Sequence, residues 1–511
     1  MLFSNNFDYI VKSCNFVETK ESNYFHNMRS LLKACIVSLC VIGFFTACKK
    51  DSPDGGDPSG SNTPENVIKY RTMDLQVITP SVVIGEMVSN TYKDGWGQME
   101  FSAPVTSIPD NAFKDNKNLV SIEFSNKVES IGGSAFKGCT NLISITTGNG
   151  IKTIGTSCFS GCTALKEFSI ADGITALREF VFENCKSLEK VYVGKGLKEA
   201  DYMTFSQCTK ISQVHIKDLA SWCQNHVGGY IIAYSDASPS LYMDNKVLSD
   251  VVIPNGLSEI YYGVFSYFHQ IKSVTLPESV TSIGGSAFYN CVDLERINFP
   301  ASLKEIHDDA FYGCKNLKRV DIASIDLWCG FCFYPDDDNP QVPPKNPFNF
   351  SHEGHLYLNG KEVTEVSIPN GAKKVEDYSF TNLINLTTVS IPDTVEEIGV
   401  AAFAGCSSIT SITLPDRVSL IQPSAFSGSG AQSIFMGSGV TFIGSLSFRN
   451  CKNLVTIKIN AVNPPRLIAD KYTPTFEGCD KLTKIIVPSG TLQTYKSTNG
   501  WDTVSHLLVE E

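Results

Sequence analysis

The 511-residue chain lacks the short motifs that mark the common catalytic sites. It has no Gly-x-Ser-x-Gly nucleophile turn, no Gly-x4-Gly-Lys-Ser/Thr phosphate loop, no His-Glu-x2-His zinc motif and no Gly-x-Gly-x2-Gly dinucleotide fingerprint. Each of these motifs fixes a nucleophile, a phosphate or a metal ion where a reaction needs it. We therefore predict a protein that is not an enzyme and that needs no cofactor and no metal ion.

Positive charge is also scarce. The chain carries 42 Lys and Arg against 53 Asp and Glu, which gives a formal net charge of −11. No basic block is long enough to follow a phosphate backbone, so we expect no nucleic acid among the partners.

A period of 23 residues organises most of the chain. It is marked by phenylalanines and by apolar-x-apolar triplets such as Ile122-Glu123-Phe124. The series comprises Phe113, Phe136, Phe159, Phe182, Phe205, Phe265, Phe288, Phe311, Phe380, Phe403, Phe426, Phe448 and Phe476. Such a period is typical of leucine-rich repeats. We predict a right-handed, strand-rich leucine-rich-repeat solenoid in which each triplet directs two side chains into the core and one to solvent.

The repeat divides the chain into five expected segments. These are upstream residues with a signal peptide (1–47), a flexible tether (48–66), an N-terminal cap (67–98), the solenoid (99–462), and a last repeat with a C-terminal cap (463–511). Counting back from Glu123 makes Glu100 the first rung. A cap is needed before it because an uncovered first turn would expose its apolar face.

Two related insertions, residues 217–250 and 323–365, interrupt the period. Each contains a Trp-Cys pair, and each ends in a segment whose central residues favour a tight hairpin turn. The turn pairs are Asp244-Asn245 and Asn359-Gly360. We expect both insertions to project from the stack.

Nine of the 17 cysteines lie three residues after a phenylalanine of the series. They are Cys139, Cys162, Cys185, Cys208, Cys291, Cys314, Cys406, Cys451 and Cys479. Stacked cysteines would have Cα atoms about 4.8 Å apart, but parallel side chains rarely reach the dihedral angle of a disulfide. We predict buried thiols.

A second set of polar residues resembles a metal site. Cys329-x2-Cys332 precedes His352-x2-His355 in the second insertion, and an acidic run, Asp336-Asp337-Asp338, lies between them. The spacing departs from the common zinc pattern, and the acidic run lacks the glycine and distal glutamate of a calcium loop. We favour plain loop residues and leave a disulfide between Cys329 and Cys332 open.

The N-terminal region resembles a bacterial lipoprotein signal. Met28 is the expected start, and residues 34–47 form an uncharged, largely apolar stretch of 14 residues that ends in Phe45-Thr46-Ala47-Cys48. This resemblance to a lipobox implies cleavage before Cys48 and lipid attachment there; an ordinary secretory signal is the alternative. The acidic segment after Cys48 resembles the export signal that sends Bacteroidetes lipoproteins to the outer face of the outer membrane.

Repeats such as SVTSIGGSAFYNC and VEEIGVAAFAGC, together with the Trp-Cys insertions, are similar to those of the BspA-like leucine-rich-repeat family of bacterial surface proteins. The resemblance covers residues 67–511. It implies a non-catalytic protein of the cell surface that binds host matrix proteins or other cells.

The solvent-facing centres of the triplets are the main candidates for a ligand-binding surface. Tyr192 and His215 occupy adjacent rungs, as do Phe435 and Lys458 further along, although packing against the insertions would also explain them. We predict adhesion to surface proteins. The alternatives are glycan capture for nutrient uptake, in which aromatic residues stack on sugar rings, and a structural envelope role. The residues proposed for stacking are Tyr192, Trp222 and Trp328.

Overall fold

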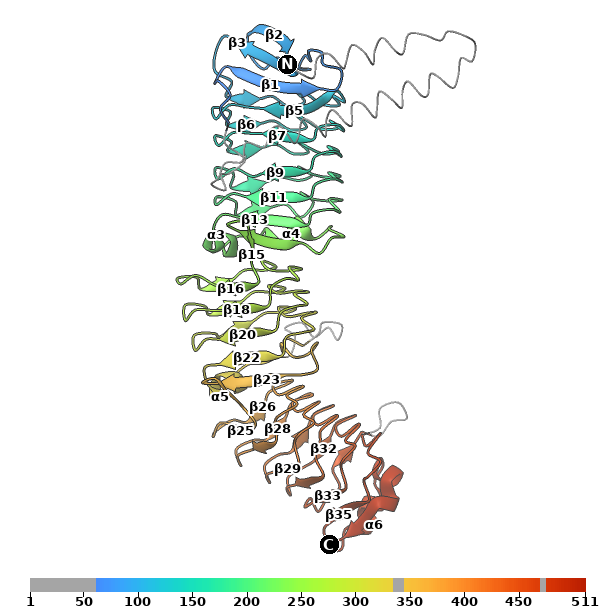
Figure 1. Cartoon of the computed structure of the whole chain (residues 1–511). Helices are drawn as coiled ribbons and strands as arrows, with labels where there is room; N and C mark the ends of the chain where they lie inside the picture. The colour runs from blue at the N-terminus through green and yellow to red at the C-terminus, as the bar shows by residue number, and fades with distance from the viewer. Residues whose placement is uncertain (1–60, 334–343, 469–474) are drawn as a thin grey trace, which may run out of the picture. The chain divides into compact units, whose positions relative to one another are not determined.

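The computed structural model describes residues 61–333, 344–468 and 475–511 (Figure 1). Backbone contacts separate Met1–Asp57 from Pro58–Glu511, and the described residues all belong to the second unit. The expected start at Met28, the signal peptide and the lipid site Cys48 therefore lie outside the described residues. Where the structure describes the chain, no helix combines the length and apolar character needed to cross a membrane.

The repeat forms a parallel β-solenoid, which confirms the predicted fold class (Figure 1). The longer strands make one face: β5 (Leu119–Glu123), β7 (Ser144–Thr146), β9 (Glu167–Ser169), β11 (Lys190–Val193), β13 (Gln213–Ile216), β14 (Ser240–Met243), β16 (Asp250–Val252), β18 (Ser273–Thr275), β20 (Arg296–Phe299), β22 (Arg319–Ile322), β23 (His355–Leu358), β25 (Glu365–Ser367), β27 (Thr388–Ser390), β29 (Ser411–Leu414), β31 (Ser433–Met436), β33 (Thr456–Ile459), β35 (Lys484–Val487) and β36 (Leu508–Glu510).

A second row of two-residue strands closes the turns: β4 (Ser107–Ile108), β6 (Ser130–Ile131), β8 (Thr153–Ile154), β10 (Ala176–Leu177), β12 (Glu199–Ala200), β17 (Glu259–Ile260), β19 (Ser282–Ile283), β21 (Glu305–Ile306), β26 (Lys374–Val375), β28 (Glu397–Ile398), β30 (Leu420–Ile421), β32 (Phe442–Ile443) and β34 (Arg466–Leu467). Neighbouring strands pair at the repeat interval; Val191 pairs with Val214, for example. Val191 and Val193 are buried and Tyr192 between them is half-buried, as the triplet pattern predicts.

The phenylalanine series forms a continuous ring stack inside each run of uninterrupted repeats. Phe113, Phe136, Phe159, Phe182 and Phe205 stack with centroid separations of 5.1–5.6 Å and nearly parallel planes. A parallel ladder places equivalent side chains directly above one another, so one large flat ring per turn fills the core without gaps.

The nine repeated cysteines are free, buried thiols, which confirms the prediction. Each sulfur donates a hydrogen bond to the backbone carbonyl of the phenylalanine one turn earlier; Cys162 Sγ lies 3.2 Å from the Phe136 oxygen, and Cys208 Sγ lies 3.0 Å from the Phe182 oxygen. Burial raises the pKa of Cys406 to about 12, which keeps the proton on sulfur. The thiol therefore serves both as a small apolar filler and as a link between successive turns.

The N-terminal cap differs from the expectation. Strands β2 (Met87–Lys93), β3 (Trp96–Phe101) and β1 (Val67–Thr72) form an antiparallel sheet, and β1, not β3, pairs with β5. Lys69 lies opposite Glu123, so the predicted first rung at Glu100 was wrong. An antiparallel strand suits a cap because it ends the parallel register and covers the first turn.

The two insertions do not project from the stack, so the sequence prediction that they would project was wrong. Strands β14 and β23 continue the parallel face, and β15 (Lys246–Val247) and β24 (Lys361–Glu362) fold back antiparallel against them. All four predicted turn residues have positive φ, which confirms the tight turns. Each return strand ends its sheet, and a new sheet starts at β16 and again at β25. We call residues 217–250 the first joint and residues 323–365 the second joint.

Short helices lie in the two joints and at the C-terminal end of the solenoid. The first joint holds α3 (Leu219–Cys223) and α4 (Gly228–Ile232), and the second holds α5 (Ile325–Cys329). At the C-terminal end, α6 (Leu492–Ser497) and the 3-10 segment η1 (Trp501–Leu507) bury Tyr495 and Trp501 against each other. Their polar atoms donate to the carbonyls of Ala461 and Pro465, both at 2.7 Å.

The burial of the repeated thiols predicts a sharp order of reactivity. Site-resolved alkylation of the native chain should label the exposed Cys332 first, whereas the nine repeated cysteines should react only after denaturant is added, because water-exposed thiolate is the reactive species. Mass spectrometry of each cysteine peptide gives the rates. Labelling of Cys162 or Cys185 in the folded chain at the rate of Cys332 would contradict the structure.

Candidate ligand-binding surface

Tyr192 and His215 meet on the outer side of the strand face. They are paired residues of β11 and β13, and their rings stack with centroids 4.6 Å apart. Both side chains occupy the triplet centre, which the alternation of a strand directs away from the core. The sequence prediction that they occupy adjacent rungs is therefore correct.

A third ring extends this stack. Tyr242 of β14 pairs with His215, and the two rings lie 4.6 Å apart and 14° from parallel. Sequence reasoning missed Tyr242 because the first joint was expected to project. The available signal was the triplet Leu241-Tyr242-Met243, which repeats the apolar-x-apolar pattern. We call Tyr192, His215 and Tyr242 the aromatic column.

Burial favours the neutral forms of His215 and Tyr192 in the aromatic column. Burial, and then the positive charge of Lys190, lower the pKa of His215 below its ordinary value. Burial, and then the negative charge of Glu167, raise the pKa of Tyr192. Nε2 of His215 lies 3.1 Å from Oε1 of Gln213, which fixes the ring. The column thus presents a flat, neutral and rigid edge of three rings.

Phe435 and Lys458 form a separate pair near the C-terminal end. They face each other across β31 and β33, as predicted. Lys458 forms an ion pair with Glu511, so its charge is already compensated. Phe435 is half-buried and stands alone among polar neighbours, which makes this pair a weaker candidate than the aromatic column.

Trp222 and Trp328 are buried, with 1% and 0% of their surfaces exposed. This burial contradicts the prediction that they stack on sugar rings. They instead fill the joints, where the phenylalanine stack is interrupted. Trp222 packs edge-on against Phe268 at 6.1 Å, and Trp328 lies 5.9 Å from Phe299. This burial could not be predicted from the sequence, because an aromatic residue in an insertion has the same appearance there whether its side chain is exposed or buried.

The metal-like residues of the second joint do not come together. Cys329 is half-buried, Cys332 is exposed, and both thiols are free. His355 pairs through Nδ1 with Glu362 at 2.5 Å. Among the described residues, no three His, Cys, Asp or Glu side chains have the geometry to hold a metal ion. The acidic run at 336–338 lies outside the described residues.

A parallel solenoid with a short-strand second row and a repeat of about 23 residues defines the leucine-rich-repeat class. The chain belongs to the BspA type leucine-rich-repeat family, whose family model matches in six copies over residues 95–226, 238–334 and 354–464.

Several solved structures are similar to this chain. A leucine-rich repeat protein from Bacteroides ovatus is 23% identical, with 84% of this chain and 91% of that chain covered and a TM-score of 0.35. A leucine rich cell surface protein from Faecalibacterium prausnitzii is 20% identical, with 83% and 89% covered and a TM-score of 0.28. The pneumococcal vaccine antigen PcpA is 17% identical, with 84% and 89% covered and a TM-score of 0.31. A search of curated proteins found no match.

The two buried tryptophans allow a matched test of their structural role. Nε1 of Trp328 donates to the Ser379 carbonyl at 2.7 Å, whereas Nε1 of Trp222 has no hydrogen-bond partner among the described residues. Trp328→Phe should therefore cost about 1–3 kcal/mol more in free energy of unfolding than Trp222→Phe, since it leaves a buried carbonyl without its donor. Urea denaturation measures both values, and equal losses would contradict this assignment.

Proposed function

We propose that this chain is a non-catalytic surface protein that binds a protein ligand through the aromatic column. The observation that carries the proposal is the stack of three rings at Tyr192, His215 and Tyr242, on the face that the solenoid does not use for its core. Most other triplet centres nearby are polar, as at Thr146, Ser169 and Thr275, so stability does not require rings at these positions.

The properties of the column suit a protein interface. Tyrosine rings supply large contact area and lose little conformational entropy on binding, and mutual stacking orders them before a ligand arrives. Their edges offer hydroxyl and imidazole groups for hydrogen bonds, while the absence of net charge avoids a desolvation cost. Adhesion to host matrix proteins or to proteins of other cells is the function that this surface supports best.

Glycan capture is less well supported because two of its three proposed stacking residues, Trp222 and Trp328, are buried. Tyr192 remains, and one face of its ring is stacked against His215. A purely structural envelope role requires no ligand and therefore does not explain why three aromatic rings occupy adjacent triplet centres on the solvent side.

The cellular setting follows from the N-terminal sequence. A lipid on Cys48 would anchor the chain in the outer membrane, and the polar segment up to residue 66 would hold the solenoid away from the membrane at the cell surface. This arrangement leaves the strand face accessible to host or bacterial proteins.

The binding proposal is tested by titrating the purified chain against immobilised matrix proteins, mucins and a glycan panel side by side. We expect saturable binding to a protein. Tyr192→Ala, His215→Ala and Tyr242→Ala should each weaken it about tenfold or more, as expected for the centre of an interface. Phe435→Ala is the matched control and should bind normally. Unchanged affinity in all three column variants would rule out this surface as the binding site. Absence of binding to every ligand tested would favour the structural role.

Lipidation has its own test. Cys48→Ser should release the chain from the membrane fraction into the soluble fraction, because the thiol that would carry the lipid is replaced by a hydroxyl. Fractionation with immunoblotting detects the shift, and Cys35→Ser is the matched control within the same segment. A Cys48→Ser chain that still sediments with membranes would rule out this anchor.

A further inference from the structure

Strand β2 makes a long edge at the N-terminal end of the solenoid (Figure 1). It is the outermost strand of the sheet β2-β3-β1-β5-β7, and within the described residues it pairs only with β3. It has seven residues, whereas every other strand that ends a sheet in the described part of the chain has two to four. Proteins keep edge strands short because their unpaired backbone groups attract another strand. The length of β2 therefore points to a strand that pairs with it.

The N-terminal cap also carries much of the exposed apolar surface. Among the described residues, 15 large apolar or aromatic side chains are exposed, and seven of them lie between residues 73 and 88. The hydrogen bond from Nδ2 of Asn90 to the Ile78 carbonyl, 2.8 Å long, holds this segment beside β2. Exposed apolar side chains that gather in this way mark an interaction surface. The seven are Met73, Leu75, Val77, Val82, Val83, Met87 and Val88.

The sequence just before the cap does not provide the missing strand. Residues 49–60 read KKDSPDGGDPSG, with two prolines, three glycines and five charged residues. Proline cannot donate to a strand ladder, and glycine weakens one. This composition also offers no large apolar side chain to cover the exposed ones of the cap, so the partner strand must come from another molecule.

The edge is complementary to a second copy of itself. Its regular stretch is Ser89–Lys93, because the pairing with β3 shifts between Met87 and Ser89. An antiparallel copy related by a two-fold axis at Thr91 would set Thr91 opposite Thr91 and Lys93 opposite Ser89. Threonine pairs are favourable across strands. The two lysines would lie four residues apart, or about 13 Å, so like charges would not face each other.

The charges favour this register. Ser89 pairs with Glu100 of β3, and its hydroxyl lies 3.4 Å from the Glu100 carboxylate. Lys93 of a second copy would therefore share a face of the sheet with Glu100, two strands or about 10 Å away, with only the small serine between them. Extended lysine and glutamate side chains span that distance. Among the described residues, neither Lys93 nor Glu100 has an ion-pair partner.

We propose that β2 pairs edge to edge with β2 of a second copy of this chain, across a two-fold axis at Thr91. The pairing joins two five-stranded sheets and closes on itself, because the same edge of both copies is used and neither long edge stays free. A single foreign strand would instead present a new free edge. The contact is independent of the aromatic column, so either proposal can fail without the other.

Sedimentation equilibrium tests the pairing on the full chain carrying Cys48→Ser, so that no lipid can hold two copies together. We expect a monomer–dimer equilibrium. Lys93→Glu and Glu100→Lys should each weaken the dimer roughly tenfold, because each substitution acts at two symmetry-related contacts. The double variant should restore the dimer, since it exchanges the two charges. Lys361→Glu, in the sheet-ending strand β24, is the matched control and should leave the dimer unchanged.

Thr91→Cys tests the register itself. Oxidation with copper phenanthroline should link two copies through position 91, because the axis sets this position opposite itself. Mass spectrometry of the linked peptide identifies the bond. Lys93→Cys is the matched control and should not link to its own equivalent.

Three results would overturn the proposal. They are a chain that stays monomeric over the whole concentration range, a dimer that neither charge reversal weakens, and an assembly that grows beyond two copies. A chain that is monomeric alone but binds an extended peptide at β2 would assign the edge to a foreign strand instead.

Discussion

Every turn of this solenoid must present a similar cross-section to the next one, and the stacked phenylalanines, together with the buried thiol that nine of the repeats carry, meet that constraint. The rings stack at 5.1–5.8 Å throughout the series, and each buried thiol hydrogen-bonds to the phenylalanine carbonyl one turn back. A residue that changed size in this column would disturb the turns on both sides. The triplet centres and the joints carry no such constraint, and they are therefore free to vary.

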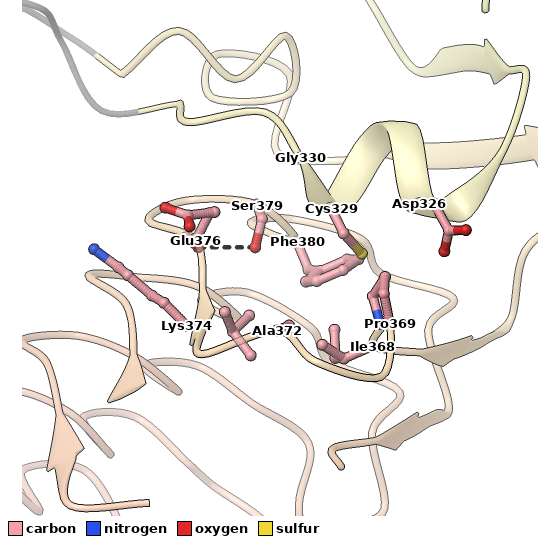
Figure 2. A pocket seen from close by; sticks show the side chains of 11 residues that line it. Asp326, Cys329, Gly330, Ile368, Pro369, Ala372, Lys374, Glu376, Ser379 and Phe380 are labelled. Atoms are coloured by element: carbon pink, nitrogen blue, oxygen red, sulfur yellow. Dashed lines mark hydrogen bonds between the residues drawn. The ribbon is translucent and has the colours of Figure 1, made fainter. Parts of the chain in front are cut away.

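The candidate functional features lie where the repeat is broken. The aromatic column ends on Tyr242, in the strand that the first joint adds to the face. A pocket whose lining includes Asp326, Lys374 and Glu376 lies at the second joint (Figure 2). Trp222 and Trp328 keep the core continuous across these breaks, so the joints gain new surface without leaving a void.

The sequence period was sufficient to predict the solenoid and the free thiols, and the turn-forming residue pairs were sufficient to predict the tight turns at Asp244-Asn245 and Asn359-Gly360. It also identified two of the three rings of the aromatic column. It could not predict that β1 runs antiparallel between β3 and β5, because a residue count carries no strand direction. The placement of Tyr242 on the strand face and of Trp328 in the core was missed for a related reason. The repeat period assigns a residue of an insertion to the face or to the core only if the insertion is known to stack on the neighbouring turns.

The account is tested most directly by hydrogen–deuterium exchange of the chain with and without the matrix protein that binds it. Exchange reports each backbone amide separately, so a footprint can be compared strand by strand. Protection on binding should concentrate in β11, β13 and β14, the strands that carry the aromatic column. Protection confined to the C-terminal strands β31 and β33, or to the N-terminal cap, would contradict it.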